Sequence, residues 1–163
     1  MSLTLRDAAP ADVPLVLRLI RALAAYEKLL HEVQATEADV RRLLFGDTPR
    51  ASALVAEWEG EPVGFALWYY SVSTFLGRPS LYIEDVYVDP AQRNRGIGRA
   101  IFAELARRAV AEGCGRMEWS VLDWNAPSIA FYRSIGARPR EGWTLQQLTG
   151  PALAALAATA TGP

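Results

Sequence analysis

The feature that most constrains this chain is a β-type run that ends in a basic, glycine-containing loop and then a helix. The run Leu81–Val88 (LYIEDVYV) closes at Asp89-Pro90, and the sequence QRNRGIGRAIFAEL leads into a helix predicted over Gly98–Ala111. Glycine at 96 and 98 lets a ligand approach the backbone closely, because neither residue has a Cβ. The unpaired amides at a helix start attract an anion. Positive charge comes from Arg93, Arg95 and Arg99, so the sequence predicts a phosphate-binding loop.

Two better-known phosphate motifs do not fit this loop. A dinucleotide fingerprint needs a third glycine at position 101, where this chain has Ile101. A P-loop needs Gly-Lys-Ser/Thr, which does not follow here. A plain glycine turn with solvated arginines remains an equal alternative on the loop alone.

The other elements predict one α/β domain over residues 1–163, with a mixed, mostly antiparallel sheet and helices on both faces. Strands are predicted at Leu3–Arg6, Ser52–Trp58, Val63–Val72, Leu81–Val88, Arg116–Leu122 and Trp143–Leu148. Helices are predicted from Ala9–Asp12 onward, from Thr36 (with Asp39 completing a capping box) to Gly46, and from Asn125–Ser128 to Gly136. The apolar face of the first contains Val13, Val16, Leu17, Ile20, Leu23 and Ala24. The tail, 151–163, is predicted as a short helix or a frayed end.

Composition excludes several classes of protein. The formal net charge of −1 argues against nonspecific nucleic-acid binding. One cysteine, Cys114, and one histidine, His31, allow neither an intramolecular disulfide nor a cysteine or histidine zinc cluster, and we expect no metal. No signal peptide and no apolar stretch of roughly 20 residues is present, so we expect a cytoplasmic protein without a membrane partner.

Two separated segments resemble the GNAT superfamily of acyl-CoA-dependent N-acyltransferases. Arg93-Asn94-Arg95-Gly96-Ile97-Gly98 matches its Gln/Arg-x-x-Gly-x-Gly/Ala pyrophosphate loop. Asn125 and Phe131-Tyr132, followed by Gly136-Ala137, match its second signature in the expected order. The resemblance implies a GNAT-like domain that takes acetyl-CoA as the acyl donor.

Four stretches further resemble the diamine (spermidine/spermine) and thialysine N-acetyltransferases: AYEKL at Tyr26, Ile83-Glu84-Asp85, WNAPSIAFY and Glu141-Gly142-Trp143. This resemblance implies a homodimer that acetylates a small-molecule amine. Asn94 stands where those enzymes tend to have glycine, and Arg95 where they tend to have an apolar residue. Both changes bear on the path of the loop and its fit to the donor.

The resemblance also implies catalytic roles. The counterpart of Tyr132 protonates the sulfur of coenzyme A, and a phenol with a pKa of about 10 can pass a proton to a thiolate. Without the resemblance, Tyr132 would be read as packing on the sheet with its hydroxyl in water. Glu84 is implied near the amine, to hold it or take its proton through water; a salt bridge to an arginine is the alternative. Neighbouring strand residues point to opposite faces, so only one of Glu84 and Asp85 is expected to face a given cavity.

Further residues are assigned to the two substrates. For the donor, we expect the loop residues Arg93, Asn94, Arg95, Gly96, Ile97, Gly98 and Arg99, a backbone amide among Val86, Tyr87 and Val88 for the oxyanion, Asn125 for pantetheine, and Tyr132. Asn125 could equally be a simple helix N-cap. For a cationic acceptor, we expect Tyr26, Glu27, Glu32, Glu84, Asp85, Glu141 and Trp143, although the glutamates could be ordinary surface charges.

Direct transfer in a ternary complex is favoured over an acyl-enzyme, because Cys114 has no histidine near it in sequence and reads as a small buried residue. His31 is expected to be exposed rather than catalytic. The main alternative to an enzyme is a module that binds acyl-CoA as a sensor, although Tyr132 argues against it. A third hypothesis keeps the enzyme and changes the acceptor to an amino acid, an aminoglycoside or a protein N-terminus.

Overall fold

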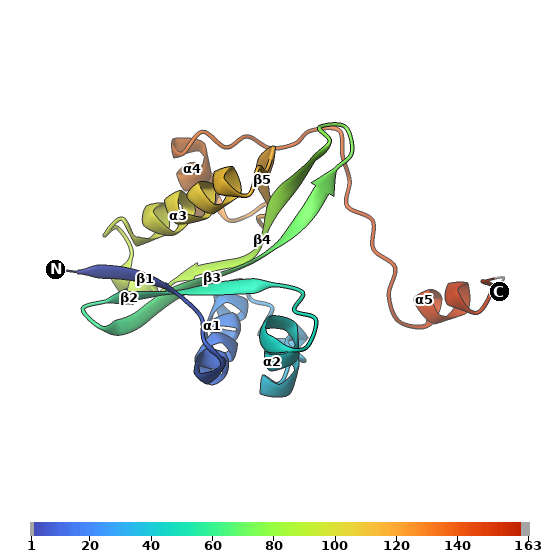
Figure 1. The fold of residues 1–163 in the computed structure, drawn as a ribbon, viewed down its shortest axis with the longest axis horizontal. Helices are drawn as coiled ribbons and strands as arrows, with labels where there is room; N and C mark the ends of the chain where they lie inside the picture. The colour runs from blue at the N-terminus through green and yellow to red at the C-terminus, as the bar shows by residue number, and fades with distance from the viewer. Residues whose placement is uncertain (1, 161–163) are drawn as a thin grey trace. The chain divides into compact units, whose positions relative to one another are not determined.

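The structure is a computed structural model that describes residues 2–160, and the chain divides into two compact units, one through Ala126 and one from Pro127 onward. The first unit contains a five-stranded sheet in the order β1-β2-β3-β4-β5 (Figure 1). The first four strands are antiparallel neighbours and β5 runs parallel to β4, which confirms the mixed, mostly antiparallel sheet. The strands are β1 (Leu3–Asp7), β2 (Ser52–Trp58), β3 (Glu61–Ser73), β4 (Arg78–Val88) and β5 (Arg116–Trp119).

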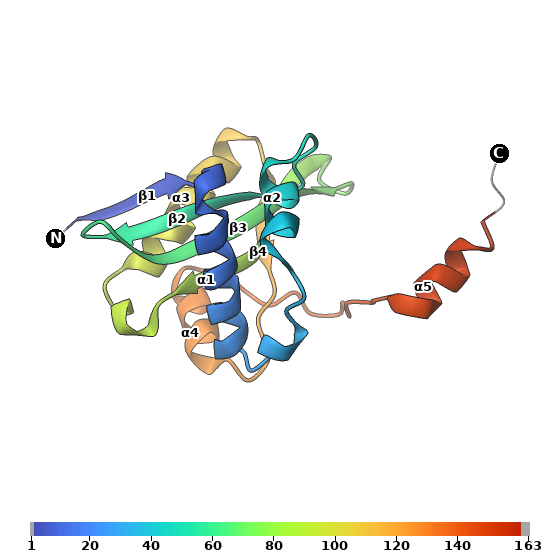
Figure 2. The same ribbon diagram turned by 90° about the horizontal axis from the view of Figure 1, so that it is seen from below.

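Helices cover both faces of this sheet, as expected. α1 (Val13–Tyr26) and α2 (Glu37–Phe45) lie on one face, and α3 (Ile97–Ala111) lies on the other (Figures 1 and 2). Short 3-10 turns precede α1, follow it and precede the loop before α3, at Pro10–Asp12, Leu30–Glu32 and Pro90–Gln92. Among the described residues, no helix is long and apolar enough to cross a membrane.

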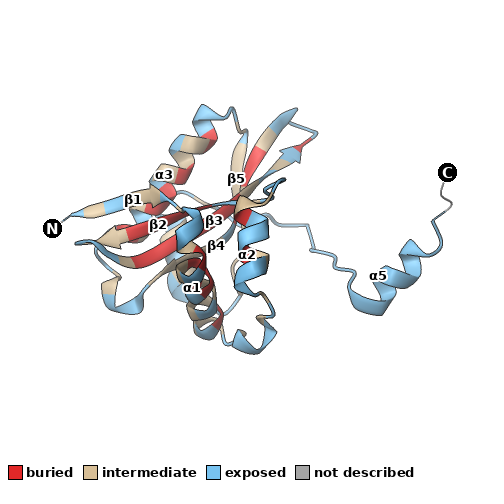
Figure 3. Ribbon diagram, turned by 60° about the horizontal axis from the view of Figure 1, so that its bottom comes forward, coloured by how far each residue is buried: buried red, intermediate tan, exposed pale blue. Residues whose placement is uncertain are grey.

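The buried residues of the first unit form two layers against the sheet (Figure 3). On the α1–α2 side, Val13 and Val16 pack with Phe65 and Leu67 of β3. On the α3 side, the ring of Phe102 meets that of Trp119 edge-on with centroids 4.9 Å apart. Burial of these apolar side chains is the main favourable term holding helices to the sheet, at roughly 1.5–3 kcal/mol for each large side chain.

Local signals fix the ends of several elements. Thr36 and Asp39 form the expected capping box, with the Asp39 amide donating to the Thr36 hydroxyl and the Thr36 amide donating to the Asp39 carboxylate. The β2–β3 hairpin turns through Glu59 and Gly60, both with positive φ (54° and 86°), as a two-residue hairpin turn of type I′ requires. These caps and turns depend on neighbouring residues alone, so they are readable from sequence.

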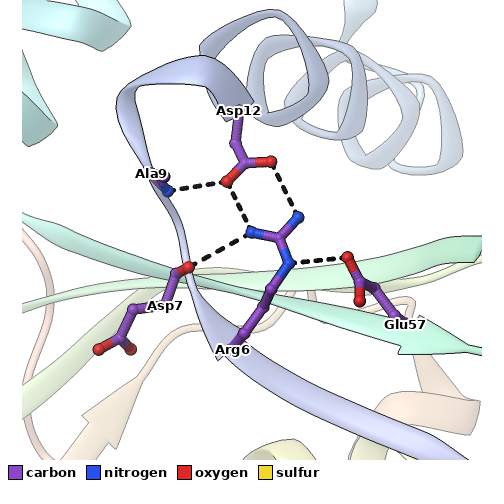
Figure 4. A network of polar contacts seen from close by, with 5 residues as sticks. All are labelled: Arg6, Asp7, Ala9, Asp12 and Glu57. Atoms are coloured by element: carbon purple, nitrogen blue, oxygen red, sulfur yellow. Dashed lines mark hydrogen bonds and ion pairs between the residues drawn. The ribbon is translucent and has the colours of Figure 1, made fainter. Parts of the chain in front are cut away.

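A polar network ties the start of the chain to the sheet (Figure 4). The Arg6 guanidinium donates to both oxygens of Asp12 (2.7 and 2.9 Å) and to Glu57 (2.7 Å). The Asp12 carboxylate also accepts from the Ala9 amide, and the hydrogen bonds from Arg6 lower its pKa. These contacts join β1, β2 and the turn before α1, so the role of the network is structural.

The second unit holds α5 (Gly150–Ala157) and all of α4 (Ala126–Ser134) except its first residue, which belongs to the first unit. The strand predicted at Trp143–Leu148 is wrong: these residues are in neither helix nor strand, and Trp143 and Leu145 are 68% and 90% exposed. A strand is stabilised by pairing, and no described strand pairs with this segment. Of the two alternatives for the tail, a short helix or a frayed end, the structure has a short helix at α5, and residues 161–163 lie outside the described residues. That residues 1–163 make one domain stays a prediction.

Candidate active site

The glycine-containing loop joins the end of β4 to the start of α3. Asn94 and Gly96 both adopt the left-handed conformation, with φ of 62° and 81°. Asparagine is among the few residues other than glycine that adopt it at modest cost, so Asn94 supports a backbone conformation that glycine would also supply. Gly96 is the N-cap of α3 and provides no side-chain cap, so no side chain of the cap competes with a ligand for the first amides. This arrangement fits a pyrophosphate.

The loop arginines divide into two groups. The Arg93 Nε donates to the Val88 carbonyl oxygen (3.1 Å), and its guanidinium lies 4.5 Å from the centroid of the Tyr26 ring. Arg95 lies 5.3 Å from the centroid of the Trp58 ring. Arg99, in the first turn of α3, is exposed. Two of the three arginines are therefore held on aromatic rings of the sheet and α1, and Arg95 anchors the loop to β2.

Ile97 differs from its loop neighbours because its side chain is in the core and only 1% exposed. It can therefore reach a donor only through its backbone. Its burial fixes the start of α3 on the sheet, and so positions the amides that follow.

A β-bulge changes how the two carboxylates of β4 are placed. Tyr69 pairs with Tyr82 and Trp68 with Ile83, but the next β3 residue, Leu67, pairs with Asp85. Glu84 is therefore the extra residue of the bulge. One residue along β3, from Trp68 to Leu67, corresponds to two residues along β4. Cross-strand partners share a face, so Asp85 and Tyr82 lie on the same face although they are three residues apart.

The charge of Glu84 acts on two groups of that face. Its charge raises the pKa of Asp85 and also the pKa of Tyr69, which shares a face with Leu67. The alternation on which we expected Glu84 and Asp85 to point to opposite faces therefore does not apply at this position. Strict alternation holds only in a regular strand, and the bulge interrupts it here.

A third carboxylate faces this pair from the end of α1. Burial, and then the charges of Glu84 and Glu27, together raise the pKa of Asp85 to about 6. Burial likewise raises the pKa of Glu27. A buried carboxylate whose ionisation is disfavoured by two other carboxylates makes a site that a cation would stabilise. Among residues 2–160, no group of metal-ligating side chains is close enough to hold a metal ion.

The same region is where β4 and β5 part. Their parallel pairing ends at Ile83 and Trp119, whereas β4 continues to Val88 paired with β3 alone. The edge of Val86, Tyr87 and Val88 away from β3 therefore has no strand partner in the described chain. Backbone groups on such an edge can bind a ligand.

Asn125 is the one predicted site residue outside Ile97 that is almost fully buried, with 5% exposed. Its side-chain oxygen accepts a hydrogen bond from the Tyr26 hydroxyl (3.2 Å). Two neighbours that the sequence reasoning missed complete this cluster: Trp124, 6.1 Å from the Tyr26 ring, and Lys28, whose Nζ lies 5.0 Å from the Trp124 ring. Trp124 directly precedes Asn125 in the WNAPS run, which was the available signal.

In the second unit, Tyr132 is a partly buried residue of α4 and contacts the Phe131 ring. Its carbonyl oxygen accepts from the amides of Ile135 and Ala137, which close the helix end at Gly136 (φ 90°). Glu141 and Trp143 are exposed, and the Arg140 guanidinium lies 4.5 Å from the Trp143 ring.

The remaining candidates have ordinary surroundings. His31 and Glu32 are exposed, with 3.9 Å between His31 Nε2 and Glu32 Oε1. Burial raises the pKa of the Cys114 thiol, which disfavours the thiolate that a nucleophile needs. Neither finding supports a covalent acyl-enzyme.

Comparison with known proteins identifies the class. Residues 19–137 match the model of the acetyltransferase (GNAT) family, and the chain belongs to that family. It is therefore an acetyltransferase, and GNAT acetyltransferases use acetyl-CoA as the acyl donor.

Particular relatives extend the likeness over nearly the whole chain. The chain is 41% identical to the bovine (Bos taurus) thialysine N-epsilon-acetyltransferase, across 94% of this chain and 96% of that protein. It is 38% identical to the human (Homo sapiens) spermidine/spermine N(1)-acetyltransferase-like protein 1, across 86% of this chain but 22% of that longer protein. Among solved structures, an integron cassette protein from the mobile metagenome of V. cholerae superposes with a TM-score of 0.80 at 24% identity, covering 98% and 99% of the two chains. The last of these establishes the fold alone.

Proposed function

We propose that this acetyltransferase moves the acetyl group of acetyl-CoA to a primary amine of a small cationic acceptor: a diamine, a polyamine or a thialysine-like amino acid. Transfer is direct, within a ternary complex. The observation that carries the proposal is the bulge in β4, which places Asp85 on the α1 face beside the point where β4 leaves β5, where the charges of Glu84 and Glu27 both act on it. The thialysine and polyamine relatives support the same acceptor class.

The donor would be held by the loop and its surroundings. Backbone amides from Gly96 to Arg99 face the pyrophosphate, with the exposed Arg99 guanidinium beside them, because a helix start favours negative charge. Asn94 and Arg95 shape the loop, and Arg93 braces it. Asn125 contacts pantetheine. One amide among Val86, Tyr87 and Val88 stabilises the oxyanion.

The acceptor ammonium would be recognised by charge. Asp85, with a pKa of about 6, is ionised at neutral pH and can bind a cation together with Glu27. Glu84 is exposed, so it takes the amine's proton through a water molecule and passes it to solvent. The neutral nitrogen then forms the C–N bond while the C–S bond breaks. Tyr132 gives its proton to the leaving thiolate and regains one from the new ammonium nitrogen.

Glu141 and Trp143 are proposed as a further carboxylate and aromatic face for a long acceptor, because an indole ring attracts an ammonium group. The sequence also assigns Tyr26 to the acceptor, but its side chain contacts Asn125 and Arg93, so we do not propose it as an acceptor contact. Glu32 remains an exposed charge whose role in attracting cations is general rather than specific.

A homodimer is also proposed. Trp143 and the second unit's leucines at 145, 148, 153 and 156 are about half exposed or more, and such surfaces usually meet a partner. A second copy of the chain is the partner that the family resemblance implies. The cytoplasmic location expected from the sequence stays a prediction.

The test is acetyl-CoA-dependent thiol release across a panel of spermidine, putrescine, thialysine, lysine, an aminoglycoside and a peptide. We expect turnover with a small cationic amine, and a loss of roughly 10²–10⁴-fold in kcat for Tyr132→Phe, the usual range for a general acid. Tyr70→Phe, which removes a hydroxyl from the exposed part of β3, is the control. Tight acetyl-CoA binding without turnover on any amine would favour the sensor alternative instead.

A further inference from the structure

The last turn of α1 touches both proposed substrate sites at once. Tyr26 is the final residue of α1, and besides Trp124 its side chain contacts Asn125 and Arg93, two residues expected on the donor side. The next residue, Glu27, is close enough to Asp85 to raise the pKa of that carboxyl. Tyr26 therefore lies against the donor side, although the sequence reading groups it with the acceptor.

The helix end holds these two residues in fixed relation. The Leu29 amide donates to the Ala24 carbonyl (2.8 Å) and the Lys28 amide donates to the Ala25 carbonyl (3.1 Å). This is a Schellman motif, with Lys28 in the left-handed position that glycine usually fills (φ 64°). Lys28 also stacks on Trp124, so the turn is fastened to the segment that carries Asn125.

Each contact of Tyr26 orients a different donor residue. Its hydroxyl donates to the Asn125 side-chain oxygen, and this hydrogen bond constrains the orientation of the Asn125 side chain. Its ring supports the Arg93 guanidinium, whose Nε is already bound to the Val88 carbonyl. Arg93 thus joins α1 to the end of β4, at the first residue of the loop.

We propose that Tyr26 is a positioning residue for the acetyl-CoA site: it sets the orientation of the Asn125 side chain and braces Arg93, and so holds the phosphate loop and the pantetheine contact in register. It does not bind the acceptor. The inference rests on the proposed function, because it assigns Asn125 and the loop to the donor.

Calorimetric titration with coenzyme A, which carries the pyrophosphate and pantetheine but cannot react, tests this directly. Tyr26→Phe keeps the ring under Arg93 and removes only the hydrogen bond to Asn125. We expect the Kd for coenzyme A to rise roughly two- to tenfold, the effect of one hydrogen bond lost at a buried group. Tyr26→Leu removes the ring as well, and we expect a larger rise. Tyr70→Phe is the matched control and should leave the Kd unchanged.

A double-mutant cycle separates positioning from general damage. If the hydroxyl acts through Asn125, then Tyr26→Phe should add little to the rise in Kd already caused by Asn125→Ala. A merely structural role would lower the midpoint of urea unfolding and leave the Kd of the folded protein unchanged. In steady state, Tyr26→Phe should raise KM for acetyl-CoA and leave KM for the amine alone.

Two results overturn the inference. One is a wild-type Kd for coenzyme A in Tyr26→Phe; the other is an effect confined to KM for the amine, which would make Tyr26 an acceptor contact. Failure of the proposed function looks different, because the wild-type protein itself would then either not bind coenzyme A or bind acetyl-CoA without acetylating any amine of the panel.

Discussion

Asp85→Asn should stabilise the protein at neutral pH while weakening its use of the acceptor. Burial and the charges of Glu84 and Glu27 raise the pKa of Asp85 from 3.8 to about 6. At about 1.4 kcal/mol per pKa unit, ionising this carboxyl costs the folded state about 3 kcal/mol. Asparagine keeps the size and polarity of the protonated acid and never ionises, so the variant avoids that cost.

The pH dependence follows from the sign of the change. A carboxyl whose pKa is raised by folding binds its proton more tightly in the folded state than in the unfolded state. Between about pH 4 and pH 6, the folded wild type therefore holds more protons, and its stability falls as the pH rises through this window. Above about pH 6 the full penalty is present, and below about pH 4 it is absent.

Urea unfolding followed by far-ultraviolet circular dichroism measures the difference. We expect Asp85→Asn to exceed the wild type by up to about 3 kcal/mol at about pH 8, and by almost nothing near pH 4. Glu61→Gln, which removes an exposed carboxylate from β3, is the control and should show no such divergence. A variant that is less stable than the wild type at pH 8, or a gap that does not change with pH, would refute the reasoning.

Three further changes test the loop and the end of α1. Gly96→Ala should cost about 1–2 kcal/mol of stability because φ is 81°, and it should weaken coenzyme A binding in calorimetry. The control is Gly60→Ala, at φ 86° in the hairpin turn, which should cost the same stability and leave binding unchanged. Asn94→Gly should leave coenzyme A affinity within about twofold, since glycine adopts the same φ freely, and a large loss would show that the Asn94 side chain itself binds. Lys28→Gly should relieve about 1–2 kcal/mol of backbone strain and lose about 0.5–1 kcal/mol of stacking on Trp124, for a small net gain in the urea midpoint; a clear loss would contradict this balance.

Sequence alone predicts those parts of this fold that depend on neighbouring residues. The capping box at Thr36, the strand Ser52–Trp58 and the helix after the glycine loop follow from spacing and from turn chemistry, and each is present. The segment Trp143–Leu148 has a pattern suited to a strand but no partner among the described strands. The residues of a segment do not by themselves determine whether another strand pairs with it. The stacking of Arg93 on Tyr26 joins positions far apart in the chain and has no local signal.

The bulge at Glu84 belongs to the same non-local class, and it decides the character of the site. A regular β4 would put one of Glu84 and Asp85 on each face, where each could pair separately or reach water. The bulge places Asp85 on the α1 face, where burial and then the charges of Glu84 and Glu27 raise its pKa, and this raised pKa corresponds to a cost for the folded state. This arrangement suits an amine-binding site. It destabilises the protein without ligand, and a bound cation offsets the cost of ionising the buried carboxylate. The adjacent acidic pair inside an apolar strand was the visible sign in the sequence; its meaning depended on a register that only the paired strands determine.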